Sequence, residues 1–162
     1  MTTPAVVDSQ YSVSVTSRVD APPDCVYGII ADYRVGHPAI LPKQFTSLTV
    51  ENGGAGAGTV IRCEMRVLGQ KQMFRAAVTE PQPGRVLVET IIEGDPLVTT
   101  FTVVPADAGR ASEVTISSSI VKKPGLRGMI ERFLSPRILA PMYREELRLL
   151  NEYAKRRVEG AR

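Results

Sequence analysis

The sequence has no tryptophan, a single histidine and two cysteines, and aromatic residues make up only 6% of its 162 residues. Proteins that bind single-stranded nucleic acid stack bases on aromatic side chains, so we expect no nucleic-acid partner. The histidine and the widely separated Cys25 and Cys63 match no zinc-ligand spacing, so no metal site is expected. The two cysteines also indicate no disulfide framework, and we expect buried thiols in a reducing compartment.

Long apolar runs are absent as well. No stretch offers the roughly 18 consecutive apolar residues of a membrane span. Residues 1–5 have neither the basic region nor the apolar core of a secretory signal, so we expect a cytoplasmic protein. The glycine-rich run at 53–58 leads into a strand pattern and therefore lacks the helix N-terminus of a dinucleotide-binding loop. We expect no cofactor, and we interpret this run as a flexible hairpin loop in a position to gate a cavity.

The net charge of +3 is concentrated near the C-terminus, where residues 126–162 contain nine Lys/Arg and five Asp/Glu. Such a segment can contact an anionic surface, or it can mediate docking or a homodimer. The acidic residues of the segment alternate with its arginines, which is typical of a solvated helix face. Among these acidic residues are Glu131, Glu145, Glu146 and Glu152.

Strand patterns dominate the first three-quarters of the chain. In the first of them, the apolar residues Tyr11, Val13 and Val15 alternate with hydroxyl side chains, the period of a half-buried strand. Short turn sequences rich in glycine and proline separate the later strands, so neighbouring strands should be antiparallel. The predicted strands cover residues 11–19, 45–51, 59–68, 72–80, 86–93, 98–104 and 113–121.

Three segments predict helices. Pro22, Pro23 and Asp24 favour a helix start, and a second short turn is expected at 34–41. The last segment repeats apolar residues every three or four positions, so they share one helix face. Its Ser135-Pro136 pair resembles a helix cap, so we expect a break or bend near 135 and a main helix that runs to about 157.

This order of elements predicts an α+β fold in one domain. We expect flexible tails at 1–9 and 159–162, with a single domain at 10–158. A seven-stranded antiparallel sheet needs a cover for its apolar face, and the C-terminal helix is the longest candidate. One helix is about 10 Å wide, too narrow to seal a curved sheet, so we expect an apolar cavity between the two.

The sequence resembles the START and pollen-allergen-like superfamily (SRPBCC), in particular its polyketide cyclase/dehydrase and lipid-transport branch. The resemblance covers residues 10–157 and implies a helix-grip fold, in which the curved sheet wraps around the long C-terminal helix. It also implies a ligand cavity rather than one particular reaction. The motifs that carry it are 11–15, 19–22, Val26-Tyr27, Ala31-Asp32-Tyr33, 56–61 and 80–87.

Strand parity predicts which side chains face this cavity. In 59–68 the charged row formed by Arg62, Glu64 and Arg66 should face solvent. In 86–93 both rows are mostly apolar, and we place Glu89 on the solvent side; the inward row of 98–104 stays open. The predicted ligand-binding residues are Tyr27, Tyr33, His37, Ile61, Cys63, Met65, Phe74, Ala76, Val88, Thr90, Ile116, Ser118, Ile138, Met142, Tyr143 and Leu147.

No catalytic constellation can be named from the sequence. In the resembling fold His37 borders the expected cavity mouth, the place for a general base or a hydrogen-bonding group for a ligand. With no second histidine and no paired nucleophile, we favour the alternative of a plain loop residue. The first hypothesis is therefore binding of a small hydrophobic molecule, such as a lipid, polyketide or aromatic metabolite, for transport, sequestration or sensing. The alternative is a polyketide cyclase or dehydratase, which predicts a polar inward patch around His37, Glu89, Arg75 or Tyr143.

Overall fold

The computed structural model describes residues 10–161, apart from the side chains of residues 130 and 132–134. The tail predicted at 1–9 and the last residue of the chain lie outside the described residues. The elements are β1 (Gln10–Val19), α1 (Pro23–Ala31), α2 (Gly36–Ile40), β2 (Phe45–Asn52), β3 (Val60–Val67), β4 (Gln70–Gln82), β5 (Val86–Glu93), β6 (Leu97–Ala106), the 3-10 turn η1 (Asp107–Gly109), β7 (Ala111–Val121) and α3 (Gly125–Gly160).

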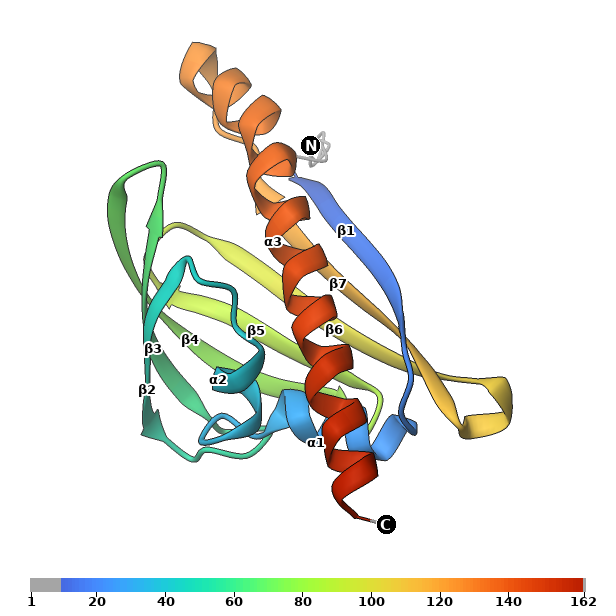
Figure 1. The fold of residues 1–162 in the computed structure, drawn as a ribbon. Helices are drawn as coiled ribbons and strands as arrows, with labels where there is room; N and C mark the ends of the chain where they lie inside the picture. The colour runs from blue at the N-terminus through green and yellow to red at the C-terminus, as the bar shows by residue number, and fades with distance from the viewer. Residues whose placement is uncertain (1–9, 162) are drawn as a thin grey trace, which may run out of the picture.

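The seven strands form one antiparallel sheet in the order β1-β7-β6-β5-β4-β3-β2. Strands β2 to β7 follow one another as a meander because short turns join them. Strand β1 pairs with β7 and forms one edge of the sheet. The sheet curves around α3, which crosses its concave side (Figure 1). The predicted α+β helix-grip fold is confirmed.

Helix α3 is longer and more continuous than the sequence predicts. It begins at Gly125 and runs for 36 residues with Pro136 and Pro141 inside it. Of the predicted break or bend near 135, the break is therefore wrong, and the bend stays a prediction. The Ser135 hydroxyl donates to the Glu131 carbonyl at 2.7 Å, within the helix rather than as a cap at its start. No helix among the described residues combines the length and apolarity of a membrane span.

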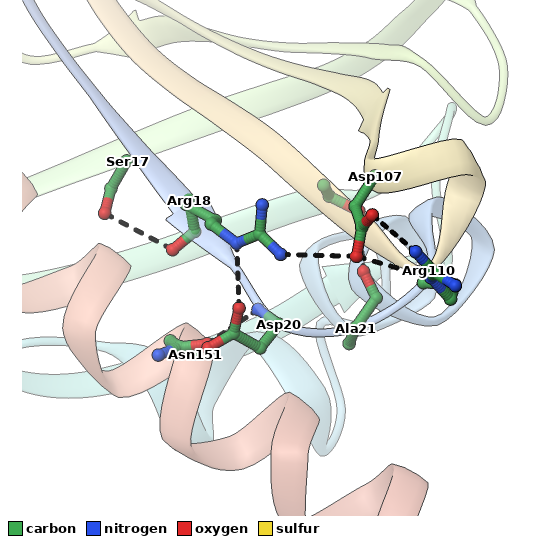
Figure 2. Close-up of polar contacts among 8 residues, drawn as sticks. Ser17, Arg18, Asp20, Ala21, Asp107, Arg110 and Asn151 are labelled. Carbon is green, nitrogen blue, oxygen red and sulfur yellow. Dashed lines mark hydrogen bonds and ion pairs between the residues drawn. The ribbon is translucent and has the colours of Figure 1, made fainter.

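A polar contact network fixes the end of β1 against α3 (Figure 2). The backbone N–H of Asp20 donates to Asn151 Oδ1 at 2.8 Å, while the Asp20 carboxylate pairs with Arg18 at 3.0 Å. The hydroxyl of Ser112 donates to the carbonyl of Ala21 at 2.8 Å, which adds β7 to the same joint. These contacts set the position of α3 over the first strands, since α3 packs mainly along β1, α1 and α2.

The inner face of the sheet carries the core. On β3 and β4, Ile61, Cys63, Ala76 and Val78 are buried, as parity predicts. Strand β6 presents Thr99, Phe101 and Val103 inward, which settles the row that the sequence leaves open. From α3 the inner stripe consists of Met142, Tyr143, Glu146, Leu147, Leu150 and Ala154.

Candidate functional site

Four polar side chains meet inside the molecule between the sheet and the helices. We call Tyr33, His37, Glu89 and Glu146 the interior acid cluster. The Tyr33 hydroxyl donates to Glu89 Oε1 at 2.5 Å. His37 Nε2 lies 3.6 Å from Glu89 Oε1 and 4.0 Å from Glu146 Oε1. Both carboxyl groups therefore lie within 4.0 Å of the same imidazole nitrogen.

The short helix α2 places His37 in this cluster. The Asp32 carboxylate accepts hydrogen bonds from the backbone N–H groups of Val35 and Gly36, both at 3.2 Å, and so caps the turn. A Cβ atom at Gly36 would lie 2.6 Å from the Ile29 carbonyl oxygen, so glycine permits the close packing of α2 on α1. His37 is consequently only 2% exposed. It is a core residue, and the loop alternative is wrong.

The surroundings of His37 fix the orientation of its ring. Nδ1 lies 2.7 Å from the Ile30 carbonyl oxygen. Because a carbonyl can only accept, Nδ1 must carry a proton, and in the neutral ring the Nε2 lone pair faces the two glutamates. The Tyr33 ring stacks on the imidazole with centroids 4.5 Å apart, and Phe101 contacts it edge-on at 5.6 Å.

Glu89 comes from the strand whose parity the sequence leaves ambiguous, and the predicted side is wrong. The buried Leu87 shares a row with Glu89, and Glu89 reaches Tyr33 on the concave side. Val88 and Thr90 therefore lie on the opposite face of the sheet from the interior acid cluster. The Glu89 side chain is 15% exposed, so the cluster is not completely enclosed.

Glu146 is the member that the sequence analysis misses. The alternation of charges on α3 places it on a solvated face, yet it is 4% exposed and its Oε1 atom has no hydrogen-bond partner. Burial, and then the charge of Glu89, raise the pKa of Glu146 to about 8. At neutral pH the Glu146 side chain is therefore mostly a neutral acid. The available signal is helical spacing, because Met142, Tyr143 and Leu150 lie three or four residues away on the same stripe.

A chain of hydroxyl groups, Thr99, Ser118 and Tyr143, extends along the same interior. Ser118 Oγ lies 2.7 Å from Thr99 Oγ1 and also contacts the Tyr143 hydroxyl. Burial raises the pKa of Tyr143 to about 12, so the Tyr143 hydroxyl keeps its proton. Ser118 and Tyr143, both predicted ligand residues, are thus brought together across the space between β7 and α3.

The glycine-rich loop at 53–58 supports the cluster from outside. The backbone N–H of Tyr33 donates to the Gly54 carbonyl, and that of Gly56 donates to the Ala31 carbonyl, both at 2.9 Å. Gly56 has a φ of 59°, and a Cβ there would lie 2.3 Å from a Glu80 carboxylate oxygen. The loop is therefore hydrogen-bonded to the segment that carries Tyr33, and its role in gating a cavity stays a prediction.

The inner face becomes less buried toward one end of the sheet. On β3 exposure rises from Ile61 and Cys63 to Met65, and on β4 it rises from Ala76 to Phe74. On β5 the same change runs from the buried Leu87 to the half-buried Glu89 and Ile91. The inward-facing side chains of β3, β4 and β5 are more exposed at the end of the sheet that carries the β3–β4 hairpin. Solvent therefore reaches these side chains from that end.

The predicted site residues fall into four groups. Tyr33, His37, Ser118 and Tyr143 belong to the polar interior, and burial followed by the charge of Glu89 raises the pKa of the adjoining Cys63 to about 12. Tyr27 is separate, because its hydroxyl donates to Glu80 at 2.7 Å. Val88 and Thr90 are on the outer row. The remaining predicted residues are buried or half-buried on the inner side: Ile61, Met65, Phe74, Ala76, Ile116, Ile138, Met142 and Leu147.

Metal binding has no obvious place in this arrangement. Among the residues that the structure describes, no three or more His, Cys, Asp or Glu side chains are placed to hold a metal ion together. The interior acid cluster itself offers two carboxyl groups, an imidazole and a phenol, with further hydroxyls nearby.

Several solved structures are similar to the chain. The solution structure of the KanY protein is 27% identical, with a TM-score of 0.78 over 90% of this chain and 98% of that chain. The ZhuI aromatase/cyclase from Streptomyces sp. R1128 is 20% identical, with a TM-score of 0.76 over 92% and 96%. Norcoclaurine synthase from Thalictrum flavum is 16% identical, with a TM-score of 0.71 over 91% and 96%. At these last two identities the likeness concerns the fold alone.

A family model gives the assignment. No curated protein matches the chain. The model described as polyketide cyclase / dehydrase and lipid transport matches residues 10–155, which is nearly the whole domain. Together with the helix-grip fold, this match shows that the chain belongs to the polyketide cyclase/dehydrase and lipid-transport family.

Proposed function

We propose that the chain binds a small hydrophobic ketone between the sheet and α3 and catalyses proton transfer on it, as a cyclase or dehydratase does. The observation that carries this proposal is the buried carboxyl of Glu146, whose Oε1 atom has no hydrogen-bond partner and lies 4.0 Å from His37 Nε2, itself 3.6 Å from Glu89 Oε1. A buried acid whose pKa lies near working pH, next to a base, is the arrangement that general acid–base catalysis requires.

The proposed reaction uses these groups in pairs. The Glu89 carboxylate, or His37 Nε2 beside it, removes a proton from the carbon next to the carbonyl. The electron pair moves toward the carbonyl oxygen, which takes the proton of Glu146, so the product is an enol. In a cyclisation the enol carbon then attacks a second carbonyl; the enol hydroxyl returns its proton to the Glu146 carboxylate as its carbonyl re-forms, and the new alkoxide takes the proton held by the base, which gives a hydroxyl group. In a dehydration, Glu146 instead protonates the hydroxyl that leaves as water while the base removes the α-proton.

The polar side chains of the interior support the enzyme proposal, which predicts an inward-facing polar patch. Of the four residues that it names, His37, Glu89 and Tyr143 face inward. Arg75 does not: it pairs with Glu51 at 2.7 Å on the outer face. The family description and the fold of an aromatase/cyclase are compatible with this chemistry.

Binding without catalysis is the second candidate. The half-buried inward side chains Met65, Phe74, Ile91 and Ile138 support it, because they offer apolar area that a ligand would cover. Burial of that area at roughly 25 cal/mol per Å² would supply affinity without any reaction. The two candidates share a binding place and differ in whether the acid cluster moves a proton.

Deuterium exchange separates the candidates. 2-Acetylnaphthalene carries one enolisable methyl group, whose exchange in D2O is followed by proton NMR. We expect the protein to accelerate this exchange and Glu146→Gln to reduce the acceleration by about 100-fold, the contribution typical of one general acid. Glu89→Gln should also reduce it, since the amide oxygen can still accept from Tyr33 but cannot act as a base.

Glu113→Gln provides the matched control, because Glu113 is an exposed carboxylate on β7 and should retain the full rate. Tight binding of the ketone with no acceleration of exchange would contradict the enzyme proposal and leave the carrier. Equal acceleration by the wild-type protein and Glu146→Gln would remove Glu146 from the mechanism.

A further inference from the structure

The buried interior, as far as the structure describes it, holds acidic side chains and one histidine but no lysine or arginine. Among the described residues, the buried charged or titratable side chains include His37 and Glu146, while no lysine or arginine is buried. Arg62 of β3 and Arg75 of β4 pair with Glu51 on the opposite face of the sheet. A further negative charge inside would meet no buried lysine or arginine among the described residues, and His37 Nε2 already faces Glu89 and Glu146.

The neighbouring groups already respond to this negative environment. Burial raises the pKa of Tyr33, Cys63 and Glu146, and the charge of Glu89 raises it further. Each of these groups is thus held in its neutral form. A ligand carboxylate placed beside Glu89 would meet the same repulsion and the same loss of hydration.

The unpartnered oxygen of Glu146 indicates which polar group of a ligand would fit beside it. Glu146 Oε1 is buried and lacks a hydrogen-bond partner, which leaves a polar atom aimed at the interior unsatisfied. A neutral carboxyl can donate one hydrogen bond and accept others. It therefore complements a ketone, an enol or a phenol, whereas a carboxylate or phosphate offers only acceptors and a repelled charge.

We infer that the interior site selects ligands by charge: it takes apolar molecules whose polar end is an uncharged oxygen group and rejects carboxylates and phosphates of the same size. The inference rests on the proposed binding of a ligand beside the interior acid cluster. Within the broad class of hydrophobic ligands, it excludes fatty acids and other lipids with an anionic end at the cluster.

A matched pair of probes tests the selectivity. 2-Acetylnaphthalene and 2-naphthoate share the ring system, and they differ in a methyl group against a charged oxygen. We expect equilibrium dialysis at pH 7 to give at least about tenfold tighter binding of the ketone. The double variant Glu89→Gln, Glu146→Gln should bring the two affinities within about threefold, because it removes the negative charge and keeps the side-chain volumes. Glu113→Gln should keep the wild-type ratio.

The outcomes separate this inference from the proposed function. Naphthoate bound as tightly as the ketone by the wild-type protein overturns the selectivity, even if exchange catalysis is observed. A preference that persists unchanged in the double variant also overturns it, since the acids would not be its cause. Selective binding of the ketone without hydrogen exchange supports the charge selectivity and contradicts the proposed catalysis. If neither probe binds, both proposals are contradicted. Circular dichroism melts of each variant verify that it is folded.

Discussion

The two faces of the sheet treat glutamate in opposite ways. On the outer face, Glu51 lies 2.7 Å from both Arg62 and Arg75, and hydrogen bonds from Arg75 and then Arg62 lower its pKa. Over the inner face, α3 presents Glu146, whose pKa is raised by burial and then by the charge of Glu89. The outer carboxylate is stabilised as an ion, whereas the inner carboxyl is forced to keep its proton.

The contrast indicates different roles for the carboxyl groups of Glu51 and Glu146. Exposed ion pairs such as those of Glu51 contribute little to folding, because water already solvates both partners. A buried acid with an unsatisfied oxygen opposes folding, and such groups occur where a protein uses them. Under the proposed function, the acids on the inner side supply reactivity and reduce stability, whereas the charge of Glu51 on the outer face is neutralised by Arg62 and Arg75.

The largest expected effect comes from making the inner face resemble an uncharged core. Glu146→Gln should decrease ketone exchange by about 100-fold and at the same time raise the melting temperature at pH 8. The amide removes the unfavourable ionisation and retains the shape of the side chain. Differential scanning calorimetry and the NMR exchange assay measure the two quantities. A variant that loses both activity and stability would instead make Glu146 a structural residue.

The pH dependence of stability sharpens the comparison further. Glutamate has a pKa of 4.5 in the unfolded chain, and Glu146 has a pKa of about 8 in the folded protein. At a pH between these two values, folded Glu146 holds a proton that the unfolded chain has released. Raising the pH across this window should therefore lower the free energy of unfolding by about 1.4 kcal/mol per pH unit from this group. Urea titrations at pH 5.5, 6.5 and 7.5 measure the slope, and Glu146→Gln should lack this component. Equal slopes for the two proteins would contradict the raised pKa.

A smaller effect is expected from the tyrosine that holds Glu89. Tyr33→Phe removes a hydrogen bond of 2.5 Å and should lower stability by about 1–3 kcal/mol, together with the exchange rate. Tyr27→Phe is its control, since Tyr27 also donates to a glutamate, Glu80, but away from the cluster. That control should lose stability and retain the rate. Comparable rate losses in both variants would mean that the rate follows stability rather than the position of Glu89.

The smallest effect should come from the outer face. Glu51→Gln leaves Arg62 and Arg75 exposed to water, so neither ketone affinity nor exchange rate should change measurably. Equilibrium dialysis and NMR exchange provide the comparison with Glu89→Gln on the inner face of β5. An outer-face change as large as the inner one would mean that the faces are coupled through the sheet.

The fold could be predicted largely from sequence because its signals are local. Alternation of apolar and polar residues, as at Tyr11, Val13 and Val15, marks strands, and turn residues mark their ends. Long-range packing overrode the local signal at Pro136, since α3 passes through it without ending. Local rules favour a helix start there, whereas burial of one helix face along β1 favours continuity.

The site was less predictable because its key residues violate the pattern that surrounds them. Glu89 is a charged residue on the inner row of a strand with two apolar rows, so parity could not place it. Glu146 follows Glu145, an exposed residue that pairs with Arg148 at 2.7 Å, and only helical spacing separates their environments. His37 becomes a core residue through the packing of α2 on α1, a contact that no periodicity reports.

The loop at 53–58 has a consequence for engineering this protein. Its backbone is bonded to Ala31 and Tyr33, so an inserted tag or a lengthened loop there would displace the tyrosine that positions Glu89. The turn at Leu68 and Gly69 is exposed at the other end of β3, and it offers a site where an insertion leaves that scaffold intact. Natural relatives that differ in the length of the glycine-rich loop would on this basis differ in reactivity, even with every residue of the interior acid cluster unchanged.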